Sequence, residues 1–143
     1  MSAIVSPKSI ARVMGLPRTV HSLGELCAAV NKGLPKSALR ASVAKVFPEG
    51  AERKAILYRI VPEATFKRRR DHLKFEESER TERLARVIAT AEHVWDDESE
   101  ARRFLTTTHT QLDGQRPVDA ALTELGARRV EELLWKLYHG IAA

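Results

Sequence analysis

Apolar side chains recur at helical spacing along most of the chain. Leu23, Leu26, Cys27 and Val30 illustrate the pattern, because positions i, i+3, i+4 and i+7 lie on one face of a helix. Glycine and proline separate one such segment from the next. The pattern predicts helices over residues 23–30, 35–47, 51–60, 62–72, 76–95, 98–105, 117–122 and 127–139.

No segment alternates apolar and polar residues with the period of two that a half-buried strand requires, so we expect an all-α fold. Residues 1–18 lack a clear period and contain two prolines and a glycine, which predicts a loosely ordered arm. Gly126 is expected to mark a bend or a close packing contact between two helices. Cys27, on an apolar face, is expected to be a packed thiol.

Charge is divided unevenly along the 143 residues, whose formal net charge is +5. Residues 1–73 carry 14 basic and 5 acidic side chains, a net charge of +9. Residues 74–143 carry 10 basic and 14 acidic side chains, a net charge of −4. This division suggests two different partners, with a polyanion for the basic half. The alternative is that surface charge simply fell unevenly.

Several classes of protein are disfavoured by the sequence. No apolar run approaches the ~20 residues that span a bilayer, and no basic segment followed by an apolar one opens the chain, so we expect a cytoplasmic protein without membrane contact. A single cysteine, Cys27, allows neither an internal disulfide nor a Cys-rich zinc site. The five histidines lack metal-binding spacing, and neither a phosphate loop nor a Gly-x-Ser-x-Gly motif occurs. We therefore expect no catalytic residues, metal or cofactor.

The segments 51–60 and 62–72 have the anatomy of a helix-turn-helix, in which the second helix enters the major groove. Its four consecutive basic residues cannot share one face, because successive positions are ~100° apart. Arg69, beside the apolar stripe, is expected to clamp a phosphate. The candidate DNA-binding residues are Thr65, Lys67, Arg68, Arg69 and Arg70, with Lys54 and Arg59 from the preceding helix. The alternative is that this charge run is only a solvated face.

The second half contains a recognisable series of motifs. They are Glu77-Ser78-Glu79-Arg80, Arg83-Leu84-Ala85-Arg86-Val87, Leu112-Asp113-Gly114-Gln115-Arg116-Pro117-Val118 and the segment from Gly126 to Gly140. This series resembles the toxin-binding domain of Xre/ParS-type antitoxins, the partners of RES-domain toxins. The upstream Thr65-Phe66-Lys67-Arg68-Arg69-Arg70 resembles the recognition helix of the same family. The resemblance covers roughly residues 34–143.

The resemblance implies a type II antitoxin, a dimer that sequesters a RES toxin acting on NAD and represses their shared operon by binding operator DNA. It implies a helix-turn-helix domain over residues 19–75 and a helical toxin-binding domain over 76–143. A higher toxin–antitoxin complex is expected as well. The candidate toxin-binding residues are Trp135, Tyr138, His139, Gly140, Ile141, Ala142 and Ala143.

The role of the last helix and the function of the whole chain each have an alternative interpretation. Leu134 and Leu137 are expected to dock the last helix on its own core, whereas Trp135 is either an exposed interface anchor or a buried residue. For the whole chain, the alternative is a stand-alone helix-turn-helix repressor whose C-terminal domain only dimerises.

Overall fold

The computed structural model describes residues 5–140, and in this range the chain is helical without any named strand, which confirms the all-α prediction. A single 3₁₀ turn, Thr110–Leu112, interrupts the described α-helices. These are α1 (Pro7–Val13), α2 (Leu23–Lys32), α3 (Lys36–Val46), α4 (Ala51–Ile60), α5 (Glu63–Arg68), α6 (Phe75–Trp95), α7 (Glu98–Leu105), α8 (Pro117–Ala120) and α9 (Glu124–Tyr138).

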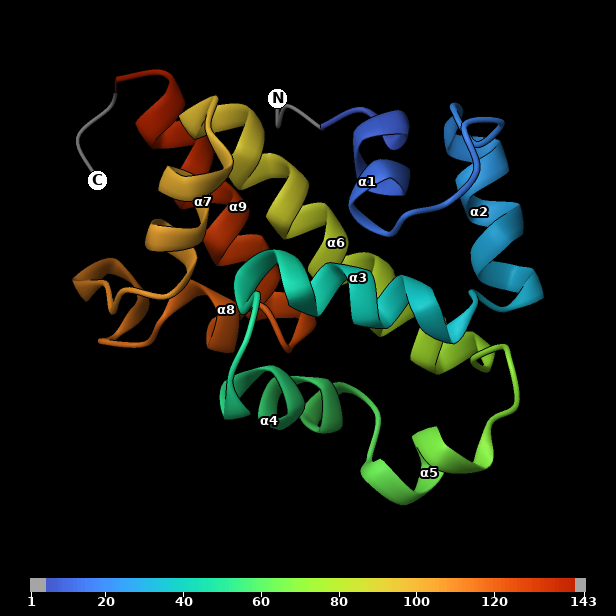
Figure 1. Cartoon of the computed structure of the whole chain (residues 1–143). Helices are drawn as coiled ribbons and strands as arrows, with labels where there is room; N and C mark the ends of the chain where they lie inside the picture. Colours follow the sequence, from blue (N-terminus) through green and yellow to red (C-terminus); the bar gives the residue numbers. More distant parts are fainter. Residues whose placement is uncertain (1–4, 141–143) are drawn as a thin grey trace.

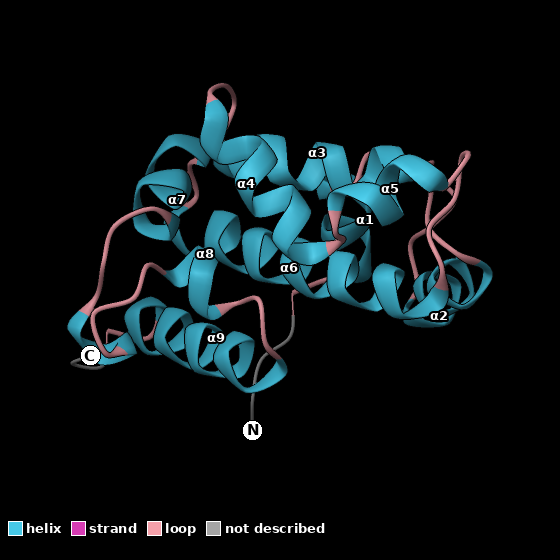
Figure 2. Cartoon of the chain, turned by 90° about the horizontal axis from the view of Figure 1, so that it is seen from below, coloured by secondary structure: helices cyan, strands magenta, loops and turns pink. Residues whose placement is uncertain are grey.

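The long helix α6 runs through the middle of the molecule, and α1, α2, α3, α7 and α9 pack around it (Figures 1 and 2). Apolar residues on several sides of α6 are almost fully buried, namely Leu84, Ala85, Val87 and Ile88. They belong to one hydrophobic core that also includes residues of the first and last helices. A helix that is apolar on so much of its circumference is stable only at the centre of a bundle.

Local signals set several helix ends. The Asp97 carboxylate accepts a hydrogen bond from the Glu100 backbone N–H at 2.7 Å, so α7 begins where the capping pattern predicts. The last helix begins at Glu124 rather than Ala127, because Thr123 Oγ1 accepts from the Gly126 N–H at 3.0 Å. Gly126 lies against the carbonyl of Ala120, which confirms the predicted close packing contact.

The prediction of a loosely ordered arm over residues 1–18 is wrong for α1. Ser6 Oγ accepts from the Ser9 N–H at 3.1 Å, and Pro7 occupies the first helical position, where a proline fits. The helix then packs on α6 and buries Ile10, Val13 and Met14. A helix of seven residues is too short for its apolar period to be recognised in the sequence.

Cys27 is exposed, so the prediction of a packed thiol is wrong. Only part of the predicted apolar face of α2 is buried. Leu26 and Val30 are buried, whereas Leu23 is 68% exposed. The helix lies at the edge of the bundle, where it contacts α1 and α6 (Figure 1).

The helix expected over 62–72 ends at Arg68, because the following residues pair with another part of the chain. Leu73 N–H donates to the Leu34 carbonyl and Lys36 N–H donates to the Asp71 carbonyl, both at 2.8 Å. Gly33 has a φ of 103°, and a Cβ there would lie 2.5 Å from the Leu73 carbonyl oxygen. The return of the chain along the start of α3 therefore requires glycine at this position.

Candidate functional sites

The helices α4 and α5 form a closely connected pair. Only Val61 and Pro62 separate them, and the Phe66 N–H donates to the Pro62 carbonyl at 2.8 Å. Phe66 is 4% exposed and meets the ring of Tyr58 edge to face, with 6.3 Å between ring centroids. This aromatic contact fixes α5 against α4 through its inner side and leaves its outer side open. The arrangement is that of a helix-turn-helix.

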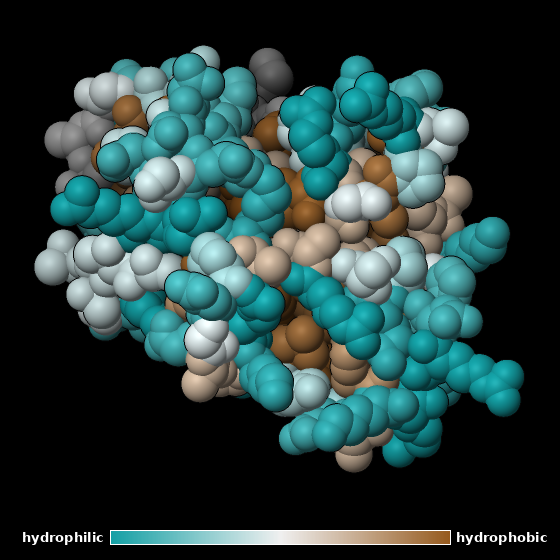
Figure 3. Space-filling model, viewed as in Figure 1, coloured by the Kyte–Doolittle hydropathy of each residue, from teal (hydrophilic) through white to brown (hydrophobic). Residues whose placement is uncertain are grey.

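The outer side of α5 carries cations with little compensation from acidic groups. Lys67 pairs with Glu63 one turn away, at 2.7 Å, but both side chains are largely exposed, so the pair is weak. Arg68 and Arg70 are exposed, and no carboxylate of the described residues lies within ion-pair distance of either. Hydrophilic side chains project from this corner of the molecule (Figure 3). Lys54 is also exposed, and Thr65 is half-buried.

Arg69 is placed differently from the phosphate clamp that its position suggested. Its Nε and Nη2 donate to the two carboxylate oxygens of Glu77 at 3.0 and 2.8 Å. The Arg69 side chain is only 16% exposed. Glu77 also accepts the Lys74 N–H at 2.9 Å, the half of a capping box that closes the start of α6. Arg69 therefore ties the end of α5 to α6 and has its main donor edge occupied.

The Arg69–Glu77 contact makes stability depend on pH. The pKa of Glu77 lies below its ordinary value of 4.5, chiefly because the Arg69 guanidinium donates to the charged carboxylate, with a smaller effect from the Lys74 N–H. A lowered pKa stabilises the folded state above pH 4.5, and this stabilisation disappears as the pH falls through the folded-state pKa.

We expect Glu77→Gln to lower the free energy of unfolding at pH 7 and to lose less further stability than the wild type below pH 4.5. Urea unfolding followed by circular dichroism at pH 7 and at several acidic values measures the difference. Parallel stability profiles for the two proteins would contradict the role given to this carboxylate.

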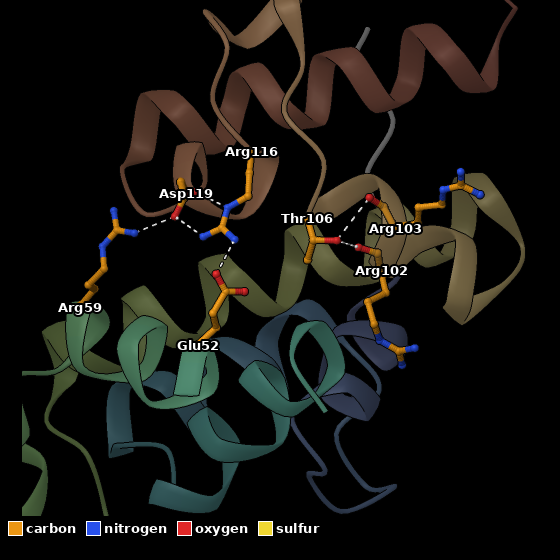
Figure 4. A network of polar contacts seen from close by, with 7 residues as sticks. All are labelled: Glu52, Arg59, Arg102, Arg103, Thr106, Arg116 and Asp119. Carbon is orange, nitrogen blue, oxygen red and sulfur yellow. Dashed lines mark hydrogen bonds and ion pairs between the residues drawn. The ribbon is translucent and has the colours of Figure 1, made fainter. Parts of the chain in front are cut away.

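Arg59 lies in a network that joins α4 to α8 (Figure 4). Its Nη1 lies 2.6 Å from Asp119 Oδ1, and Arg116 Nε lies 2.7 Å from the other oxygen of the same carboxylate. Arg116 also reaches Glu52 of α4 at 3.0 Å. The Arg59 side chain is still 53% exposed, but its guanidinium is directed at α8.

Figure 4 also shows Thr106, whose hydroxyl donates to the Arg102 carbonyl at the end of α7.

At the other end of the molecule, four rings form what we call the aromatic cluster: His93, Trp135, Tyr138 and His139. Tyr138 is central, with its ring centroid 5.2 Å from that of His93, 5.4 Å from Trp135 and 5.3 Å from His139. Trp135 is half-buried and Tyr138 is 50% exposed. The cluster thus presents aromatic surface at the end of α9.

The other candidate residues of the last helix divide between core and surface. Leu134 is fully buried and Leu137 packs against the core, as expected for a helix that docks on its own domain. Gly140 is exposed just after α9, and Ile141, Ala142 and Ala143 lie outside the described residues.

A second group of rings, not singled out from the sequence, lies where α6 ends and α7 packs. Trp95 and Phe104 have ring centroids 6.1 Å apart, and Phe104 and His109 are separated by 6.4 Å. Trp95 remains 39% exposed. The sequence gives no sign of this exposure, because Trp95 follows Ile88 and Ala91 at helical spacing.

The described residues hold no group of three or more histidine, cysteine or acidic side chains arranged to bind a metal ion. Likewise, none of the helices described between residues 5 and 140 is both long and apolar enough to cross a membrane.

Comparison with known proteins supports both halves of this description. Residues 26–86 match the antitoxin Xre-like helix-turn-helix domain, and residues 90–140 match the antitoxin Xre/MbcA/ParS C-terminal toxin-binding domain. Antitoxin Xre of Pseudomonas putida is 34% identical over 84 residues, which are 57% of this chain and 53% of that protein. The chain thus spans about half the length of this relative. With matches to both domain models of this family, the chain belongs to the Xre/ParS-type antitoxin family.

Proposed function

We propose that this chain neutralises a RES-domain toxin that consumes NAD and represses the shared operon by binding operator DNA. The observation that carries the proposal is the position of two unlike surfaces at opposite ends of the molecule: cationic α5 and the aromatic cluster at the end of α9 (Figures 1 and 2). With surfaces so far apart, one chain can contact DNA and a protein partner at the same time. The family membership supports the same pairing of roles.

The proposed DNA-binding segment is residues 19–75. Lys67, Arg68 and Arg70 are exposed on or just after α5, where they can reach phosphates, and Thr65 lies close to the N-terminus of the same helix. Lys54 adds a cation from α4. Arg59 and Arg69 contribute instead through the ion pairs that hold α4 and α5 in place.

We expect the triple variant Lys67→Ala, Arg68→Ala, Arg70→Ala to bind DNA with a weaker salt dependence. Each lost phosphate contact reduces the slope of log K against log salt concentration by about 0.9. Filter binding across a salt series measures the slope. The matched control replaces Arg103, Arg128 and Lys136, three exposed cations of α7 and α9, and should keep the wild-type slope. Equal slopes in both variants would refute the assignment of α5.

The proposed toxin-binding segment is residues 76–143, with Trp135, Tyr138, His139 and Gly140 at its surface. We include Ile141, Ala142 and Ala143 in the same proposal. Aromatic side chains that are partly exposed and mutually packed are typical of interface anchors, because they bury much area at low entropic cost. A homodimer, a larger toxin–antitoxin complex and a cytoplasmic location complete the proposal.

Co-expression tests whether the chain binds and neutralises a RES-domain toxin. The chain should relieve the growth arrest caused by the RES-domain toxin encoded beside it, and the two proteins should co-purify. Repression of the operon without relief or co-purification would instead favour a stand-alone repressor whose C-terminal part only dimerises.

A further inference from the structure

Arg40 of α3 lies over the face of Phe66, the buried ring that anchors α5. Its guanidinium carbon is 5.1 Å from the ring centroid, while the Lys36 ammonium lies 4.4 Å from the same ring. Arg40 itself is exposed. Stacking on an aromatic face restrains the flat guanidinium and leaves its N–H edges free for other partners.

The first turn of α3 is also attached to the end of α5. Lys36 Nζ donates to the Arg69 carbonyl at 3.1 Å, so α3 meets the chain directly beside the exposed Arg70. Among the described residues, no carboxylate lies within ion-pair distance of Arg40. An exposed arginine without an ion-pair partner, next to the cationic α5, adds to a positive local potential that attracts anions.

We propose that Arg40 contacts a backbone phosphate of duplex DNA, which extends the nucleic-acid interface from α5 to α3. This inference rests on the proposed DNA binding. The guanidinium fork matches a phosphate in geometry, and its position over Phe66 holds it against α5, the helix that carries Lys67 and Arg68. A phosphate contact positions the protein and does not read the bases, so it contributes equally on any sequence.

Filter binding of Arg40→Gln tests the inference with two probes, the duplex immediately upstream of the reading frame and a random-sequence duplex of equal length. The slope of log K against log salt should fall by about 0.9, and affinity should decrease by the same factor on both probes. Arg40→Lys, which keeps the charge, should retain most of the slope. Arg103→Gln removes an exposed cation of α7 and should behave as the wild type.

The outcomes separate the two proposals. If the wild type binds and Arg40→Gln keeps its slope, Arg40 is not a phosphate contact. If the wild type binds neither duplex, the proposed DNA binding fails, and this inference fails with it. Thermal unfolding of each variant shows whether the fold is retained, and Arg40→Lys provides the comparison if Arg40→Gln is destabilised.

Discussion

Gly126→Ala should lower the free energy of unfolding by about 3 kcal/mol or more, at the upper end of the range for overpacked sites. A Cβ at this position would lie 1.8 Å from the Ala120 carbonyl oxygen and 2.8 Å from its carbon. These are backbone atoms, so no side-chain rotation relieves the overlap. The helix α9 would have to move away from α8.

Such a movement would disturb more than one contact. The Gly126 N–H donates to Thr123 Oγ1, which caps α9, and Ala120 and Ala121 are buried beneath the turn. Separation of the two helices would weaken the cap and open this part of the core. The cost therefore exceeds that of a single added methyl group.

Gly24→Ala is the matched control, because Gly24 also lies in the first turn of a helix. The nearest atom to a Cβ there is Ser22 Oγ at 4.0 Å, an ordinary contact. The free energy of unfolding of Gly24→Ala should be unchanged or raised by up to about 1 kcal/mol, because alanine restricts the unfolded chain more than glycine does. Urea unfolding of both variants measures the difference. Equal stabilities would show that the turn between α8 and α9 adapts without cost.

The sequence indicates elements whose signals are local and misses those that depend on distant contacts. The ends of α4 and the start of α7 follow from prolines, glycines and the Asp97 cap. In contrast, α5 stops at Arg68 because Asp71 and Leu73 pair with Lys36 and Leu34, 35 and 39 positions earlier in the chain. Such pairing leaves no periodic trace in the sequence.

The candidate sites, too, are only partly predictable from the sequence. The excess of cations on α5 can be read from four consecutive basic residues. The pairing of Arg69 with Glu77, and of Arg59 on α4 with Asp119, cannot be read in this way, because both carboxylates belong to other helices. Arg40 carried no sequence signal at all, since only the structure places it over Phe66.

Tyr138→Ala should weaken binding of the toxin by about 30-fold, the effect of losing one hot-spot residue of about 2 kcal/mol. This prediction rests on the proposed function. Tyr138 touches three other rings of the aromatic cluster and is half exposed, so a partner that covers it buries a large, already oriented side chain. Calorimetric titration of the purified toxin with each variant measures the affinity.

Leu125→Ala provides the control on the same helix. Leu125 is 70% exposed at the opposite end of α9, so its truncation removes apolar surface of similar accessibility away from the cluster. Affinity for the toxin should then match the wild type, and both variants should keep the wild-type salt slope for DNA. If Tyr138→Ala and Leu125→Ala bind the toxin equally well, the aromatic cluster is not the anchor. If Tyr138→Ala alone also loses DNA binding, the two ends of the molecule do not act independently.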